Sequence, residues 1–366
     1  MVATARVREA ARRDLRALVH RGLDVPNFVR AATRVLRRAV PCEGTCLLTI
    51  DPATMLPTSE VADDGLPLDV LARLTEIELR EPDFNKFTDL ARAPRPAATL
   101  SEATAGELDR SIRQRELRRP SGFADELRAA LPGATGVWGA VTLLRETGRP
   151  YFSAAEARFV ASVVDELGDG LRRAMLFGGD RRDVAVRAGV VVLAADDSVE
   201  TADEAGDRWL AELSAAGGPS LLPQAIRAVA VRARAIARGD DVGRSPAELR
   251  SRTGAGHWVI VRGSVLGDGP EAGVAILLEA AGPAEMAPLI AEAYGLTERE
   301  RSVTELVAQG LSTSEIAARL HLSSYTVQDH LKSVFGKCGV ATRGDLVARL
   351  FFDHYRPRLT SSRAVT

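Results

Sequence analysis

Two helix starts of the same kind set the strongest limit on how this chain folds. Thr297 and Ser312 each stand three residues before a glutamate, Glu300 and Glu315. This spacing predicts a capping box, in which the hydroxyl and the glutamate each accept a hydrogen bond from the other residue's backbone N–H. Between the two starts lies Gly310, which suits the left-handed residue that follows a helix end. We therefore expect one helix that stops at Gly310 and a short second helix after Ser312.

A third helix is expected over residues 323–337, after a two-residue turn at His321 and Leu322. Three apolar residues repeat along it at helical spacing and predict its buried face: Val327, Leu331 and Val334. The small side chain of Ala317 allows the second and third helices to pack closely at a steep angle. Two such helices joined by a short turn form a helix-turn-helix.

The outward face of this third helix carries groups that can read DNA. Gln328, Asp329 and Lys332 lie opposite its apolar residues and can hydrogen-bond to the edges of adenine, cytosine and guanine, respectively. The start of the helix offers free backbone N–H groups and the hydroxyls of Ser323 and Thr326, which suit a phosphate. We therefore expect three base contacts and two phosphate contacts from this helix.

Charge is concentrated in the same part of the chain. The whole sequence has a formal net charge of −1, whereas residues 295–366 alone carry +3. Between residues 319 and 343 the charged side chains are four basic ones and a single acid, Asp329. A basic segment in a slightly acidic protein favours contact with a polyanion. The alternative is a helical module that binds a protein partner or a second copy.

Residues 296–352 resemble the LuxR-type DNA-binding domain of bacterial transcription regulators. The resemblance is carried by the stretches LTERE at 296–300, GLSTSEIAARL at 310–320 and TVQDHLKSVFGKCGV at 326–340, followed by Arg343. It implies four helices, with the third in the major groove of double-stranded DNA. The family's base-contacting positions fall on Gln328, Asp329 and Lys332, and its phosphate contacts on Thr326, Lys337 and Arg343.

The fourth helix is expected over residues 343–355, and its apolar set is wider than one buried face needs. The resemblance implies that this helix often pairs two subunits. We therefore expect a homodimer with Leu350, Phe351 and Tyr355 at its interface. The alternative is a helix that packs entirely on its own domain.

The upstream chain reads as two α+β domains. Over residues 1–177 the patterns predict helices at 6–20, 27–39, 67–77, 103–117, 122–130 and 153–177, and strands at 45–50, 56–61 and 136–144. Over residues 184–282 they predict strands at 189–195, 257–263 and 273–278, with helices at 202–213 and 222–237. The order of elements in the first region is similar to that of a GAF domain, and in the second to that of a PAS domain.

The predicted fold is therefore multidomain. A GAF-like sensor domain (1–177) and a PAS-like domain (184–282) precede an all-α, four-helix helix-turn-helix domain (285–356) and a tail (357–366). Such sensor domains usually bind small molecules or pair subunits. A small-molecule effector and RNA polymerase are thus partner candidates besides DNA and a second copy. No apolar run reaches the roughly 20 residues of a membrane span, and with three cysteines a cytoplasmic location is expected.

Catalysis, metals and cofactors find little support in the sequence. A signalling enzyme with an appended DNA-binding domain is the rival class, but a GxxxxGK[ST] phosphate loop does not occur and the five histidines are scattered. Cys42 and Cys46 have the spacing CxxxC without a second pair or a neighbouring histidine, which favours buried thiols over a metal site. For His257 and Trp258, strand packing is favoured over ligand contact. We expect a regulator that is not an enzyme, with no metal and no cofactor.

Overall fold

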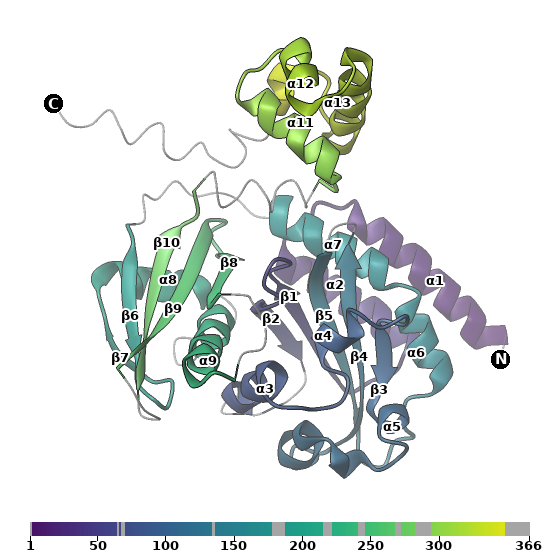
Figure 1. Ribbon diagram of the computed structural model, residues 1–366. Helices are drawn as coiled ribbons and strands as arrows, with labels where there is room; N and C mark the ends of the chain where they lie inside the picture. Colours follow the sequence, from purple (N-terminus) through teal and green to yellow (C-terminus); the bar gives the residue numbers. More distant parts are fainter. Residues whose placement is uncertain are drawn as a thin grey trace. The chain divides into compact units, whose positions relative to one another are not determined.

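The computed structural model describes residues 2–63, 66, 70–133, 136–177, 187–214, 222–240, 246–267, 272–282 and 294–347 (Figure 1). The chain forms two compact units. The first, called here the two-sheet unit, holds residues 1–182 and 186–280, and the second, the helical unit, holds 183–185 and 281–366. Two antiparallel sheet domains are thus followed by a helical C-terminal region.

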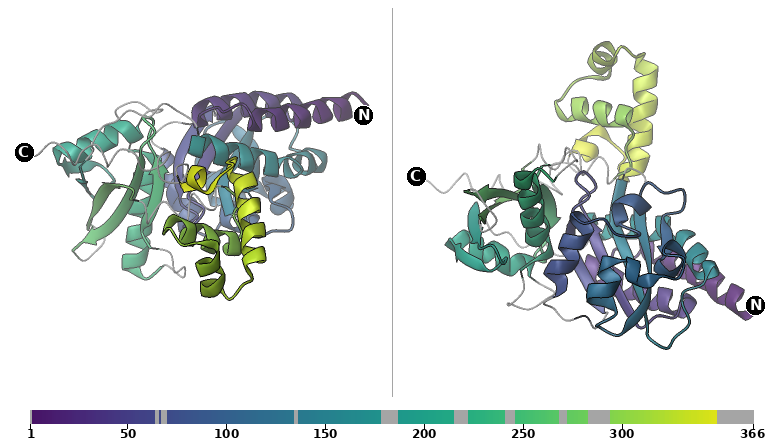
Figure 2. Two further views of the ribbon diagram at one scale, coloured as in Figure 1. Left: turned by 90° about the horizontal axis from the view of Figure 1, so that it is seen from above. Right: turned by 60° about the horizontal axis from the view of Figure 1, so that its bottom comes forward.

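The first sheet has five antiparallel strands in the order β2-β1-β5-β4-β3. Its strands are β1 (Gly44–Ile50), β2 (Pro57–Asp63), β3 (Ala97–Thr99), β4 (Phe123–Gly133) and β5 (Gly136–Glu146). Helices α1 (Val2–Val19), α2 (Val25–Ala39) and α7 (Val164–Phe177) lie together on one face of this sheet (Figure 2). The remaining elements of this part are α3 (Val70–Leu79), α4 (Phe87–Leu90), α5 (Leu100–Ala103), η1 (Leu108–Arg110), η2 (Gln114–Arg118) and α6 (Ala154–Ala161).

The second sheet repeats the same topology in the order β7-β6-β10-β9-β8. Its strands are β6 (Gly189–Leu193), β7 (Val199–Ala202), β8 (Glu248–Arg252), β9 (Trp258–Leu266) and β10 (Gly273–Ala280). Helices α8 (Glu204–Leu213) and α9 (Gln224–Arg238) follow the second strand and pack against this sheet. The three tryptophans of the chain all lie in the two-sheet unit and are buried: Trp138, Trp209 and Trp258.

The two sheets are joined by polar contacts inside one unit. In the turn after β1, Asp51 receives hydrogen bonds from Arg250 of β8. On the neighbouring elements, Arg227 of α9 forms an ion pair of 2.9 Å with Glu60 of β2. Arg252 donates a hydrogen bond of 2.7 Å to the carbonyl of Met175, near the end of α7. Because a charged donor at a helix C-terminus satisfies an orphan carbonyl, this last contact anchors the end of α7.

The prediction of a helix over residues 122–130 is wrong, because this segment is strand β4. Its Ala, Leu, Glu and Arg content favours a helix, but β4 pairs with β5 on one side and β3 on the other. Leu127, Ala129 and Leu131 enter the core beneath the helices, while Glu126 and Arg128 alternate with them and are also buried. Non-local pairing and burial on both faces therefore override the local helix propensity.

Two other helix predictions were too long. The segment 103–117 is broken into the end of α5 and the short helical pieces η1 and η2, because Ala105 and Gly106 both adopt positive φ angles that end a helix. The segment 153–177 is two helices, α6 and α7. They part at Ser162, whose hydroxyl bonds the Phe159 carbonyl at 2.7 Å and accepts a hydrogen bond of the same length from Arg12 of α1.

Most of the other predicted elements are confirmed, with ends that shift by a few residues. Strands β3, β7 and β8 were not expected. β7 and β8 lie at edges of the second sheet and carry polar residues, so the alternation of apolar side chains is weak in them. β3 has three residues, too few to show an alternation. The predicted boundary between the first two domains falls within residues 178–186, which lie outside the described residues.

The helical unit contains α11 (Glu298–Ala308), α12 (Thr313–Leu320) and α13 (Ser324–Cys338). In the right-hand view of Figure 2, α13 is the long helix that crosses the other two. The chain turns helical again at residues 343–347. The rest of the predicted fourth helix, with Leu350, Phe351 and Tyr355, and the tail 357–366 lie outside the described residues. None of the helices in the described ranges is long and apolar enough to cross a membrane.

Candidate nucleic-acid interface

Both predicted capping boxes are confirmed. At the start of α11, the Thr297 hydroxyl accepts from the Glu300 N–H at 3.3 Å, and the Glu300 carboxylate accepts from the Thr297 N–H at 2.7 Å. Ser312 and Glu315 make the same pair of bonds at the start of α12, at 3.4 and 2.7 Å. These bonds satisfy N–H groups that a helix end leaves without partners. The hydrogen bonds from Ser312 also lower the pKa of Glu315.

A tight left-handed turn joins α12 to α13. His321 ends α12 in the left-handed conformation, with φ 55°, and the N–H of Leu322 returns to the carbonyl of Ala317 at 2.9 Å. Ser323 then caps α13 by accepting a hydrogen bond of 3.0 Å from the N–H of Thr326. This geometry positions α13 immediately after α12, as a helix-turn-helix requires.

One face of α13 is buried in the small core of the helical unit. Its apolar side chains lie inside together with those of α11 and α12: Val303, Leu306, Val307, Ile316, Ala317, Val327, Leu331, Val334 and Cys338. The opposite face exposes Gln328, Asp329 and Lys332, as expected from the sequence. The structure thus brings the three predicted base-contacting residues onto one exposed face, and their roles toward DNA remain predictions.

Glu300 fastens α13 to the start of α11. Its carboxylate accepts hydrogen bonds from Ser333 at 2.7 Å and from the Lys337 ammonium at 2.5 Å, besides the cap bond from Thr297. Burial alone would raise the pKa of Glu300, but the bonds from Lys337, Ser333 and Thr297 outweigh burial and lower it to about 2. The carboxylate is therefore charged at neutral pH and holds the two helices together.

The predicted phosphate contacts already have partners within the helical unit. Lys337 also donates to the carbonyl of Gly295 at 2.9 Å, and the Arg343 guanidinium donates to the carbonyl of Leu311. The hydroxyls of Ser323 and Thr326 lie 2.8 Å apart and can share a single proton between them, which leaves the other proton for an outside acceptor. Contact of these four residues with phosphate stays a prediction.

Tyr325 is a member of the exposed face that sequence reasoning missed. It is 74% exposed, more than any other large hydrophobic side chain among the described residues. Residues 325, 328, 329 and 332 follow the spacing i, i+3, i+4, i+7, which places them on one side of a helix. That spacing is the signal in the sequence that could have found Tyr325.

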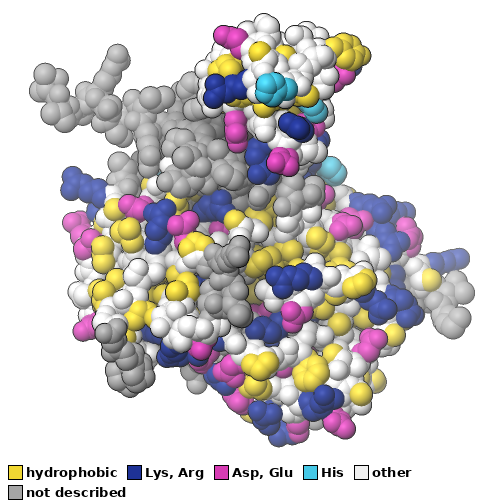
Figure 3. Space-filling view, in the orientation of Figure 1, with side chains coloured by type: hydrophobic (Ala, Val, Ile, Leu, Met, Phe, Trp, Pro, Cys, Tyr) yellow, Lys and Arg dark blue, Asp and Glu magenta, His cyan; other side chains and the backbone are white. Residues whose placement is uncertain are grey.

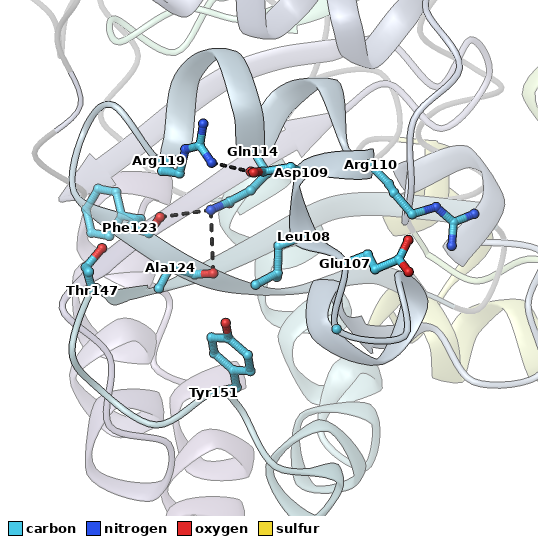
Figure 4. A pocket seen from close by; sticks show the side chains of 11 residues that line it. Glu107, Leu108, Asp109, Arg110, Gln114, Arg119, Phe123, Ala124, Thr147 and Tyr151 are labelled. Atoms are coloured by element: carbon cyan, nitrogen blue, oxygen red, sulfur yellow. Dashed lines mark hydrogen bonds and ion pairs between the residues drawn. The ribbon is translucent and has the colours of Figure 1, made fainter.

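Elsewhere, a pocket of about 710 Å³ opens in the two-sheet unit beside η1, η2 and the start of β4 (Figure 4). Among its lining residues, Asp109 and Arg119 form an ion pair and Gln114 donates to the carbonyl of Phe123 at 2.9 Å. Over the visible face of this unit, acidic and basic side chains are interspersed (Figure 3). The lining groups carry charges of both signs and so favour no single class of ligand.

A buried network of charges fills the space between β4 and the segments around η2 and Asp83. Arg113 is 1% exposed; it donates to the Glu126 carboxylate at 3.0 Å and lies 3.4 Å from Asp83. Burial opposes the charge on Glu126, but Arg113, Arg128 and Arg118 outweigh it and lower its pKa to about 2. Each buried charge here faces an opposite one, as burial of a charge requires.

The other sequence candidates show no ligand geometry. His257 lies with Nδ1 3.0 Å from a Glu212 oxygen, and Trp258 is buried, as strand packing predicts. Cys42 and Cys46 are half-buried, and burial raises the pKa of the Cys42 thiol to about 11. Within the described ranges, His, Cys, Asp and Glu form no group of three or more that could hold a metal ion.

Comparison with known families identifies the helical unit. Residues 295–350 match the family described as bacterial regulatory proteins, luxR family. A putative HTH-type transcriptional regulator of Aeromonas salmonicida is 46% identical over 59 residues, which cover 16% of this chain and 30% of that protein. The transcriptional regulatory protein UhpA of Escherichia coli is 46% identical over 56 residues, or 15% and 29% of the two chains.

The spore germination protein GerE of Bacillus subtilis is matched over a larger share of its own length. It is 44% identical over 55 residues, which are 15% of this chain and 74% of that protein. The chain spans less than a third of the length of the other two relatives. In all three cases the matched residues make up less than a fifth of this chain.

Solved structures resemble the chain only distantly. A GAF domain/HD domain protein of Geobacter sulfurreducens has a TM-score of 0.31 and 20% identity, covering 43% of this chain and 99% of that chain. The VqsR LBD domain of Pseudomonas aeruginosa has a TM-score of 0.32 and 17% identity, covering 43% and 93%.

Proposed function

The chain belongs to the LuxR family of bacterial regulatory proteins, and from that premise we propose that it is a DNA-binding transcriptional regulator. One observation carries the proposal. A helix fixed by a capped turn and by Glu300 presents Gln328, Asp329 and Lys332 together on an exposed face. A fixed helix with convergent hydrogen-bonding groups is what reading of the major groove requires.

In this proposal α13 lies in the major groove of double-stranded DNA. Gln328 pairs with an adenine, Lys332 with a guanine, and Asp329 accepts from the amino group of a cytosine. Ser323 and Thr326 at the start of the helix, with Lys337 and Arg343, contact phosphates and set the position of the helix on the duplex. Lys337 and Arg343 would share their donors between the phosphate and their present partners.

The two-sheet unit is proposed to be the sensory part. The shared strand order of its sheets supports a GAF-like domain followed by a PAS-like one. Such domains would receive a signal, with a small molecule as the effector candidate, and pass it to the DNA-binding helices. We propose a cytoplasmic homodimer, paired through a fourth helix with Leu350, Phe351 and Tyr355, that acts by binding DNA and RNA polymerase rather than by catalysis.

A selection experiment tests this function. The full chain is incubated with a pool of random-sequence duplexes over a salt series, and the bound DNA is sequenced. The proposal predicts a twofold-symmetric motif and an affinity that falls steeply with salt, because bound Lys and Arg side chains release counterions from the phosphates. A dimer on two half-sites explains the symmetry.

Two variants sharpen the result. Lys332→Ala is expected to weaken binding to the selected duplex about 10-fold or more, as loss of a base contact does. Arg13→Ala removes an exposed cation from α1 instead and is expected to leave affinity unchanged. If the full chain binds no duplex even at low salt, the DNA-binding proposal fails, and the helical unit is better treated as a protein-interaction module.

A further inference from the structure

Tyr325 occupies an unusual place for a large aromatic side chain. It is the second residue of α13, immediately before Thr326, and its side chain is 74% exposed. In the described part of the chain its hydroxyl has no hydrogen-bond partner. A single exposed aromatic residue is ordinary on a protein surface. Its position relative to other exposed residues is what indicates a function.

Tyr325 extends the exposed face of α13 toward the start of the helix. Gln328 and Asp329 follow it by three and four residues and Lys332 by seven, so the four side chains form one row. The residues that α13 buries lie on the other side of the helix, at Val327, Leu331 and Val334. The first residues of a recognition helix are the ones that come nearest to base edges in helix-turn-helix complexes.

The chemistry of the row assigns a role to the ring. Gln328, Asp329 and Lys332 can satisfy only the polar groups of base edges. The major groove also presents one apolar feature, the C5-methyl group of thymine, which apolar side chains recognise by contact. We propose that the ring of Tyr325 packs against a thymine methyl group and is a specificity-determining residue of this interface. This inference rests on the proposed function.

Replacing thymine by uracil tests the contact because it removes only the methyl group. With the full chain and the selected duplex, each thymine is replaced in turn by deoxyuridine and the dissociation constant is measured. One replacement is expected to weaken binding about 3- to 10-fold, the effect of one buried methyl group. The same replacement is expected to have no effect on Tyr325→Ala, because the ring that met the methyl group is gone.

Two further variants separate the ring from the hydroxyl and from general effects. Tyr325→Phe keeps the ring and is expected to bind as the natural chain does, with the same sensitivity to deoxyuridine. Tyr151→Ala removes another exposed tyrosine, in the two-sheet unit, and is expected to change nothing. The melting temperature of each variant shows that it is folded, and an exposed alanine near a helix start is well tolerated.

Different outcomes overturn different statements. If the natural chain selects no motif, the proposed function fails. If it selects a motif but no deoxyuridine replacement weakens binding, or if Tyr325→Ala keeps the same sensitivity, the thymine contact is wrong while DNA binding stands. If Tyr325→Ala weakens binding equally to all duplexes, the side chain contacts the sugar-phosphate backbone, and its role in specificity is refuted.

Discussion

Asp51 and Arg250, 199 residues apart in the sequence, make three hydrogen bonds across the joint between the two sheets. The Arg250 backbone N–H and Nε reach Asp51 Oδ2 at 2.8 and 3.2 Å, and Nη2 reaches Oδ1 at 2.9 Å. The carboxylate is 1% exposed. A buried charge with these partners ties the turn after β1 to β8.

Removing this carboxylate is expected to destabilise the two-sheet unit. Asp51→Ala leaves the Arg250 guanidinium without its buried counter-charge, which typically costs about 3 kcal/mol or more. Urea unfolding followed by tryptophan fluorescence measures the change. Asp63→Ala breaks an ion pair with Arg37 in which the aspartate is 75% exposed, and is expected to lose under about 1 kcal/mol. Equal losses in the two variants would show that Asp51 contributes no more than a surface pair.

Glu300 is expected to make the stability of the helical unit depend on acid pH. Its pKa is about 2 in the folded chain, below its ordinary value of 4.5. The folded state therefore favours the carboxylate, so the stabilisation is complete above about pH 4.5 and is lost as pH falls toward 2. Calorimetry from pH 7 to pH 2 should show a loss of unfolding free energy on the order of 2 kcal/mol. The unfolding transition of the helical unit is the one that Glu300→Gln shifts at pH 7, and the loss is expected in that transition. A Glu300→Gln chain with the same slope below pH 4.5 would contradict the assignment.

Asp329 is expected to lower the affinity for DNA of any sequence and to raise the selectivity for the selected duplex. Its carboxylate repels phosphates, so Asp329→Asn should strengthen binding to an unrelated duplex, by about 3- to 10-fold at low salt. If the carboxylate accepts from a cytosine, the same variant binds the selected duplex less selectively. Competition between selected and scrambled duplexes measures both effects, and Glu305→Gln, on an exposed position of α11, is the charge-matched control. Unchanged selectivity would remove Asp329 from the base contacts.

The left-handed turn offers a stabilising substitution. His321 pays a conformational penalty at φ 55° that glycine avoids, so His321→Gly is expected to stabilise the helical unit by about 1 kcal/mol. Gly339 ends α13 with φ 64° and open space around its missing Cβ, so Gly339→Ala should destabilise by a similar amount. Calorimetry compares the two variants. A destabilised His321→Gly chain would show that the histidine side chain itself supports the turn.

Local signals account for what could be predicted. Thr297 with Glu300, and Ser312 with Glu315, are hydrogen-bonded over three residues, so their spacing was enough to place α11 and α12. The exposure of Gln328, Asp329 and Lys332 follows in the same way from helical periodicity. These features depend on neighbours in the sequence, and the sequence displays those neighbours directly.

Non-local contacts account for what was missed. β4 reads as a helix because its strand partners are far away in the sequence, and Ser162 ends α6 where a helical pattern continues. Lys337 was predicted to contact a phosphate, and in the structure it forms an ion pair with Glu300. Glu300 lies 37 residues away, so the local sequence around Lys337 does not reveal this partner. Asp51 and Arg250 are 199 residues apart, so no local pattern in the sequence connects them.

The three tryptophans make the fluorescence of one unit measurable separately from that of the other. All are in the two-sheet unit, and residues 281–366 contain none. Light of about 295 nm excites the indole of tryptophan and not the phenol of tyrosine, so the emission reports on the two-sheet unit alone. A shift in that emission when DNA binds the helical unit would be a direct optical record of communication from one unit to the other, obtained without a label.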